Sequence, residues 1–386
     1  MRVLFFILIL SLSFKGSSQH VDVWLGAKMD GVHYLDNGNN VQIWGYGYYS
    51  PGLWVASLPG PTLEFTQGDS VNLFFINSSP EHHTIHLHGL DVSTDEDGVP
   101  TTSFSVGPGD TAEYNFVAAN PGGYLYHCHV LTTLHLTMGM YGMIVIKATE
   151  TNKMYNGGPS YTSTYTFLNS DMDESINTNP LSPGPFNEFK TDYFMVNGLS
   201  GNQLYNSVPN HVSAYSGDSV LLRIGNIAYT KVEYIFPEEL NAKAYMSDGR
   251  VLPMSFDCDT LVIYPGERYS ILLVPTADTD EDIKVNSYEM RNDQLESTNL
   301  IRLNPNLGIP TKSNQIVSYY PNPSNGLMYF ISENPNEKLE IFDLKGAMVY
   351  QEYVNGNSII LDLTALQNGT YVLRYLDESY KIILQK

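Results

Sequence analysis

The chain has 386 residues, of which 42% are hydrophobic and 12% aromatic, enough for two or three cores of about 100 to 150 residues each. Its formal net charge of −21 disfavours nucleic acid and anionic lipid surfaces as partners, because both carry charge of the same sign. The 31 Gly, 21 Pro and 28 Tyr, spread among short runs rich in Val, Ile, Thr and Phe, predict many short strands joined by turns.

The N-terminus has the three parts of a secretory signal peptide. Arg2 precedes an apolar run over residues 3–14, and Gly16, Ser17 and Ser18 follow it. We therefore expect a signal peptide over residues 1–18. The apolar run is shorter than the roughly 20 residues that span a bilayer, and no other run reaches that length, so the mature protein is predicted to have no transmembrane segment.

An internal repeat divides most of the remaining chain. Residues 68–77 (GDSVNLFFIN) and 217–226 (GDSVLLRIGN) share a strand-like pattern, and PGD at 108–110 is matched by PGE at 265–267. The repeat predicts two related β-domains over residues 19–150 and 151–304. A third, shorter unit over residues 313–386 follows a linker that contains Pro305 and Pro310.

Histidines gather in two short blocks, HHTIHLHG from His82 and YHCHVLTTLHLTMGM from Tyr126. Because side chains alternate between the two faces of a strand, His86 and His88 share one face and His83 takes the other. The same rule places His127 and His129 together and turns Cys128 away from them. Two sites are therefore predicted: a pocket lined by His83 and Cys128, and a surface lined by four imidazoles.

The pocket can draw two more ligands, His135 and Met140, from the loop that follows Cys128. A thiolate, two imidazoles and a thioether are the ligands of a blue copper centre. Zinc would also accept Cys and His but leaves Met140 without a role. The chain has only two cysteines, which excludes a disulfide framework, and one bridge between Cys128 and Cys258 is the structural alternative.

Residues 59–146 resemble the copper domain of multicopper oxidases, especially the two-domain, laccase-like kind. The resemblance is carried by PGPT at 59–62, HxxHxHG from His83, DGVP at 97–100, PGD at 108–110, the segment 122–129 and HxxMGM from His135. It implies an all-β chain with two cupredoxin-like Greek-key β-sandwich domains. It also implies copper as cofactor, with type 1 ligands His83, Cys128, His135 and Met140. His86, His88, His127 and His129 would form half of a type 2/type 3 cluster, which electrons reach from Cys128 through His127 and His129.

The second domain departs from this family. It reads TKVEYIF at 230–236 and IKVNS at 283–287, where the repeat would place four further histidines, and His211 lies ahead of the repeated strand. Three interpretations stay open: a copper oxidase with an unusual second site, a blue-copper electron-transfer or copper-binding protein without oxidase activity, and a nitrite-reductase-like enzyme. The resemblance implies a small-molecule or metal-ion electron donor, dioxygen as acceptor and a homotrimer.

The last unit resembles the type A C-terminal sorting domain of the type IX secretion system. The resemblance rests on YPNPSNG at 320–326, LKG at 344–346, LDL at 361–363, GTY at 369–371 and the basic C-terminal residue. It implies a small β-sandwich recognised by the type IX secretion machinery, and a protein that is secreted or held at the cell surface.

Overall fold

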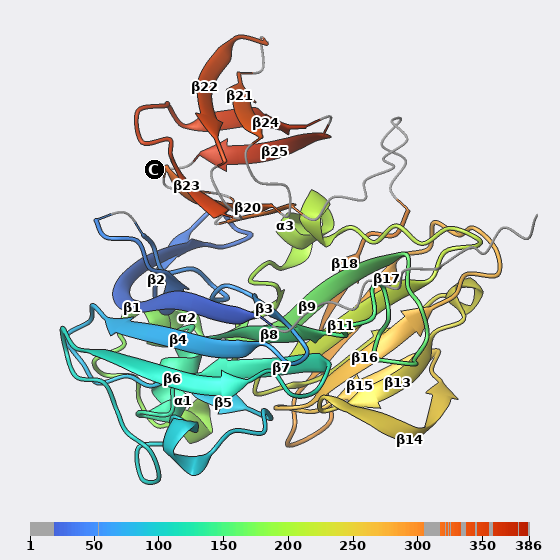
Figure 1. Cartoon of the computed structure of the whole chain (residues 1–386), viewed down its shortest axis with the longest axis horizontal. Helices are drawn as coiled ribbons and strands as arrows, with labels where there is room; N and C mark the ends of the chain where they lie inside the picture. The colour runs from blue at the N-terminus through green and yellow to red at the C-terminus, as the bar shows by residue number, and fades with distance from the viewer. Residues whose placement is uncertain are drawn as a thin grey trace, which may run out of the picture.

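The structure is a computed structural model that describes residues 19–304 except 53, and residues 317–384 except 321, 323, 325, 333–336, 344–345, 355–357 and 377. The predicted signal peptide and most of the predicted linker before the third unit lie outside the described residues. Strands predominate and each helix is at most six residues long, so the all-β prediction is confirmed (Figure 1).

The first unit consists of two four-stranded sheets around one core. Their strand orders are β2-β1-β4-β6 and β3-β8-β7-β5. Along β4, Val71, Leu73 and Phe75 are buried while their neighbours are more exposed, as expected of a strand with one face in a core. The strand bounds are β1 (His20–Tyr34), β2 (Asn40–Tyr48), β3 (Leu63–Thr66), β4 (Ser70–Asn77), β5 (His86–His88), β6 (Thr111–Val117), β7 (Gly122–His127) and β8 (Tyr141–Lys147).

The second unit also consists of two sheets, with strand orders β10-β9-β11-β16-β13-β14 and β15-β12-β17-β18. Every residue of β11 is buried, because one face lies in the core of this unit and Gly225 on the other face approaches Leu125 and Met143 of the first unit. The bounds are β9 (Ser163–Met172), β10 (Tyr193–Val196), β11 (Val220–Asn226), β12 (Lys231–Ile235), β13 (Lys243–Ser247), β14 (Arg250–Asp257), β15 (Thr260–Ile263), β16 (Arg268–Leu273), β17 (Ile283–Tyr288) and β18 (Leu295–Ile301).

The two copies of the sequence repeat occupy matching places. In the first unit, β4 lies between a parallel partner, β1, and an antiparallel partner, β6. In the second, β11 lies in the same way between β9 and β16. The turns PGD and PGE lead into β6 and β16, so the whole repeated segment has one local topology in both units.

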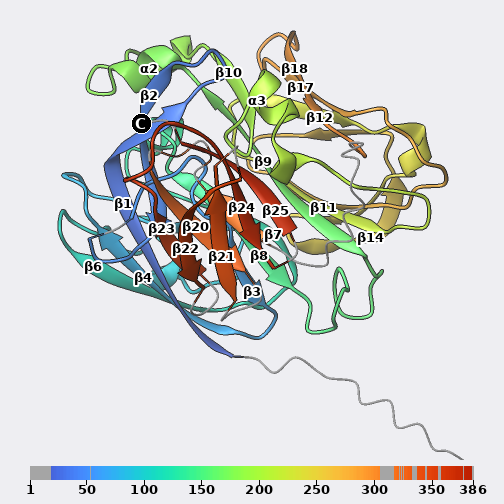
Figure 2. The ribbon, with the colours of Figure 1, turned by 90° about the horizontal axis from the view of Figure 1, so that it is seen from above.

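The C-terminal unit has its own core between sheets β19-β20-β23 and β22-β21-β24-β25. It lies over the first unit (Figure 2). The ring of Tyr329 is 6.0 Å from that of Tyr48, and the Tyr329 hydroxyl contacts the Tyr48 carbonyl. The bounds are β19 (Val317–Tyr320), β20 (Leu327–Ser332), β21 (Lys338–Phe342), β22 (Met348–Tyr353), β23 (Ser358–Asp362), β24 (Gly369–Tyr375) and β25 (Glu378–Leu384).

The helices are short and lie in the connections. They are α1 (Thr132–Thr137), α2 (Glu174–Thr178) and α3 (Gly201–Tyr205), with 3-10 turns η1 (Thr94–Glu96), η2 (Phe186–Glu188), η3 (Val208–Asn210) and η4 (Glu238–Leu240). Within the described part of the chain, no helix is long and apolar enough to cross a membrane.

Candidate metal centres

The end of β7 divides the candidate ligands between two places. His127 is the last residue of β7 and pairs with His86 of β5, while Cys128 follows it and donates its backbone N–H to the Met140 carbonyl at 3.1 Å. Because successive side chains point to opposite faces, Cys128 enters the core of the first unit and His127 faces the neighbouring histidines.

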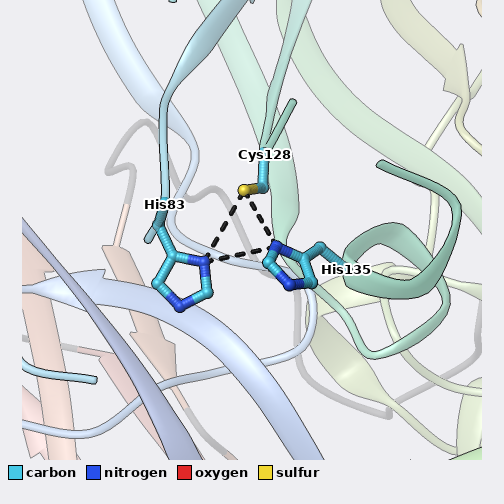
Figure 3. A group of neighbouring side chains, drawn as sticks. All are labelled: His83, Cys128 and His135. Atoms are coloured by element: carbon cyan, nitrogen blue, oxygen red, sulfur yellow. Dashed lines mark hydrogen bonds between the residues drawn. The ribbon is translucent and has the colours of Figure 1, made fainter. Parts of the chain in front are cut away.

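The first cluster consists of His83, Cys128 and His135, all fully buried (Figure 3). Cys128 Sγ lies 3.1 Å from His135 Nδ1 and 3.6 Å from His83 Nδ1, and the two Nδ1 atoms are 3.3 Å apart. Three donor atoms from separate segments thus converge on one point. His83 precedes β5, Cys128 follows β7, and His135 lies in α1.

The protonation chemistry of this cluster suits a soft metal ion. Burial, with smaller contributions from the charges of His135 and His82, lowers the pKa of His83 to about 3, and burial lowers the pKa of His135 to about 4. Both imidazoles are therefore neutral at neutral pH and can act as ligands. Burial raises the pKa of the Cys128 thiol, so a cation would have to displace its proton to obtain a thiolate. The donor set therefore fits copper.

Met140 lies in the same core as Cys128. Its side chain is fully buried in the core of the first unit, and its backbone N–H donates to the His135 carbonyl at 2.9 Å. Trp44 packs edge-on against His135, with ring centroids 5.4 Å apart. His135 Nε2 has Glu81 Oε2 at 3.5 Å, a distance compatible with electrostatic attraction, but it makes no hydrogen bond.

The second cluster is the four-imidazole face. Ligand atoms of His86, His88 and His127 lie within 4.8 Å of one another, and the ring of His129 is 5.2 Å from that of His86. The Nδ1 atoms of His86 and His127 lie 2.7 Å and 3.1 Å from the carbonyls of Asp97 and Cys128. Within the cluster, His127 Nε2 lies 3.3 Å from His88 Nδ1, so these two nitrogens are close enough to bind one metal ion. The predicted placement of all four histidines on one face agrees with this geometry.

Burial keeps two imidazoles of this cluster, those of His88 and His127, neutral at neutral pH. It is the main cause that lowers the pKa of His127 to about 3 and that of His88 to about 4, and the charge of Arg268 contributes next at His88. Neutral imidazoles whose ligand atoms already lie close together favour the binding of a cation between them. The arrangement fits a copper site of three or four imidazoles.

The second unit meets the four-imidazole face with an arginine. The turn before β16 lies against His88, since a Cβ at Gly266 would be 3.5 Å from His88 Cε1. Arg268 follows in that strand, is 5% exposed and pairs with Asp248 at 2.9 Å. Sequence reasoning missed this residue, because only the packing of the two units brings it to the histidines. The one sequence signal near it is the PGE turn, which the repeat matches to PGD.

The remaining histidines and Cys258 lie elsewhere. His211 is buried and its Nε2 lies 3.0 Å from the Tyr205 carbonyl, and within the described ranges it joins no metal-ligand group. His82 contacts Ser105 at the surface. Cys128 and Cys258 are both free, so the alternative of a disulfide between them is wrong.

Two family models match the chain. Residues 53–151 match the model described as multicopper oxidase, and residues 318–386 match the model described as a secretion system C-terminal sorting domain. The first match contains both clusters. The second contains the C-terminal unit and supports the predicted export.

Curated relatives are copper proteins. Copper resistance protein A of Escherichia coli is 40% identical over 94 residues, which are 24% of this chain and 15% of that protein. A copper-containing nitrite reductase of Neisseria gonorrhoeae is 25% identical over 227 residues, which are 56% of this chain and 53% of that protein. The matched segments thus span about half of these relatives or less.

Solved structures share the fold. A blue copper oxidase from Nitrosomonas europaea has a TM-score of 0.60 at 23% identity, covering 74% of this chain and 86% of that one. A copper nitrite reductase from the same organism has a TM-score of 0.57 at 20% identity, covering 74% of this chain and 95% of that one. At these identities the likeness establishes the two-unit β-architecture.

Proposed function

Since the chain carries a multicopper oxidase domain over residues 53–151, we propose that it is an exported copper oxidoreductase with two copper sites in its first unit. His83, Cys128, His135 and Met140 would hold a type 1 copper. His86, His88, His127 and His129 would hold copper at a second site. Copper bound there would supply one-electron redox chemistry.

The observation that carries the proposal is the division of ligands at residues 127–129. Cys128 lies 3.1 Å from His135 Nδ1 in one cluster, while the rings on either side of it, His127 and His129, belong to the other. Three consecutive residues therefore join two potential redox sites by covalent bonds. A protein that bound copper only for storage would have no need of this connection.

A small reductant has room to approach the first cluster. A pocket of about 510 Å³ is lined in part by Met29, Asp30, Pro80 and Trp44. Trp44 contacts both this pocket and His135. Trp44 and His135 are both buried, so the tryptophan ring separates the imidazole from bulk water, and the pocket has room for a small-molecule or metal-ion donor beside that ring.

The second unit supports a second candidate function, electron transfer or copper binding without oxygen reduction. The described residues of that unit place no histidine at the four-imidazole face, and Arg268 brings a positive charge there. A cation beside His88 opposes the accumulation of several copper ions by Coulomb repulsion, and the carboxylate of Asp248, paired with Arg268 at 2.9 Å, offsets part of that charge. The similarity to copper-containing nitrite reductases and the three-imidazole group support a nitrite-reductase-like enzyme as a lesser alternative.

Copper counting on the full chain tests these functions. We expect the copper-loaded protein to be blue, to bind at least two copper ions per chain and to take up oxygen with a phenolic or cuprous donor. One copper per chain with a blue colour and no oxygen uptake would exclude the oxidase and leave electron transfer.

The two cysteines offer a matched pair of variants. Cys128→Ser should abolish the blue absorption band and donor oxidation, because serine supplies no thiolate. Cys258→Ser, a change of the same kind at a buried free cysteine in the second core, should leave both unaltered. Donor oxidation that survives in Cys128→Ser would refute the role of the type 1 site.

A further inference from the structure

The helix that carries His135 makes an unusual contact with the second unit. Tyr229 Oη donates to the Thr133 carbonyl at 2.9 Å and lies 3.3 Å from Thr137 Oγ1. Thr133 and Thr137 flank His135 by two residues on either side in α1. The tyrosine therefore holds both turns of the helix that presents this imidazole to Cys128.

The helix needs such support. α1 has only six residues, and its N-cap residue, Leu131, makes no capping hydrogen bond and has a left-handed φ of 42°. A helix of this length is not stable by itself in water, because too few hydrogen bonds offset the cost of ordering the backbone. On its inner side, the chain after α1 is held by the hydrogen bond from Trp44 N to the Met138 carbonyl.

Tyr229 is itself held firmly. Its backbone N–H and that of Thr230 donate to Asp171 Oδ2 at 2.9 Å and 3.1 Å, and Thr230 Oγ1 contacts the same oxygen. Asp171 is buried in β9. The Tyr229 ring packs on Phe189, with centroids 4.7 Å apart. The hydroxyl thus projects from a fixed loop rather than from a flexible one.

The loop that carries Tyr229 has a defined position in the internal repeat. Residues 229–230 precede β12, and the repeat, which matches Gly68 to Gly217, aligns them with Pro80 and Glu81, just before the block from His83 that supplies ligands in the first unit. We propose that this segment of the second unit, which has no copper ligands, braces the His135 helix through Tyr229. Tyr229 is then a positioning residue for the type 1 site, an inference that rests on the proposed copper centre.

Tyr229→Phe tests the brace, because it removes the hydroxyl and keeps the ring on Phe189. In the metal-free full chain, we expect the backbone amides of residues 132–138 to exchange hydrogen about fivefold faster, the order expected for the loss of one ordinary hydrogen bond. In the copper-loaded protein, release of type 1 copper to a chelator should accelerate by a similar factor. The reduction potential and the electron paramagnetic resonance spectrum of that copper should also shift.

Tyr234→Phe is the matched control. It removes a buried hydroxyl that donates to Asn169 at 3.0 Å within the second unit and does not contact α1. Unchanged exchange, release rate and potential in Tyr229→Phe would overturn the brace, as would equal changes in both variants. Faster exchange at residues 132–138 in a protein that takes up no blue copper would support the brace and refute the proposed function.

Discussion

Three buried imidazoles and one half-buried imidazole determine how the metal-free protein should respond to acid. The pKa values of His83 and His127 are lowered to about 3, and those of His88 and His135 to about 4, with burial as the main cause in each case. In the unfolded chain the same groups take up protons near pH 6.5. The unfolded state therefore binds more protons between these values, and the free energy of unfolding must fall as the pH drops below about 6.5.

We expect a loss of about 2 kcal/mol for each such imidazole at about pH 5, relative to pH 7.5. Denaturant titrations of the metal-free protein at the two pH values measure it. His83→Gln should lose less stability on acidification than the parent protein, because one of the four groups is removed. An equal free energy of unfolding at both pH values would contradict the prediction.

The sequence predicts site residues that follow a local strand pattern, but it does not predict those that reach the site from a distant part of the chain. Strand alternation alone assigns His83 and Cys128 to one side and His86 to the other, and the structure places them in this way. Arg268 and Tyr229 could not be found by this reasoning. The charge of Arg268 near His88 and the hydrogen bond of Tyr229 to α1 depend on how the two units pack, and no local pattern encodes that packing.

At the level of elements, the tight connection between α1 and β8 limits which residues the ligand loop accepts. Gly139 lies between Met138 and Met140 with a φ of 111°, and a Cβ there would come within 2.6 Å of Leu58 Cδ1 and 3.0 Å of the Trp44 carbonyl oxygen. Gly109, in the PGD turn, also has a positive φ of 80° but has open space around it. The two glycines share the backbone requirement and differ in crowding.

Gly109→Ala should therefore lower the free energy of unfolding by about 1 kcal/mol, the cost of a left-handed backbone for an L-residue. Gly139→Ala should lower it further and should weaken the blue absorption band, because the new methyl group pushes the loop that carries His135 and Met140. Denaturant titration and absorption spectra of both variants give the comparison. Equal losses of stability with full blue colour in both would show that crowding at Gly139 is unimportant.

At the level of the whole molecule, the C-terminal unit, which matches the sorting-domain model, is structurally separate from the two units before it. It has its own core, and the contact of Tyr329 with Tyr48 joins it to β2, a strand that carries no ligand of either cluster. Removal of residues 318–386 should leave the copper content per chain unchanged and should retain the protein inside the cell envelope. Copper analysis and cell fractionation measure the two outcomes.

Tyr329→Phe provides the control for that truncation. It removes the hydroxyl that contacts the Tyr48 carbonyl but keeps the sorting domain intact, so export should continue. Loss of copper in the truncated chain would show that the C-terminal unit supports the first unit, in disagreement with the separate cores.

The alternation at residues 127–129 also constrains how this protein can change over generations. A substitution at His127 or Cys128 alters one cluster at a time. A single inserted or deleted residue near the end of β7 would instead reverse which side chains face the core and which face the imidazoles, and would remove ligands from both clusters together. The segment is therefore expected to tolerate changes of residue type more readily than changes of length. An insertion or deletion there would impair both clusters in the same step.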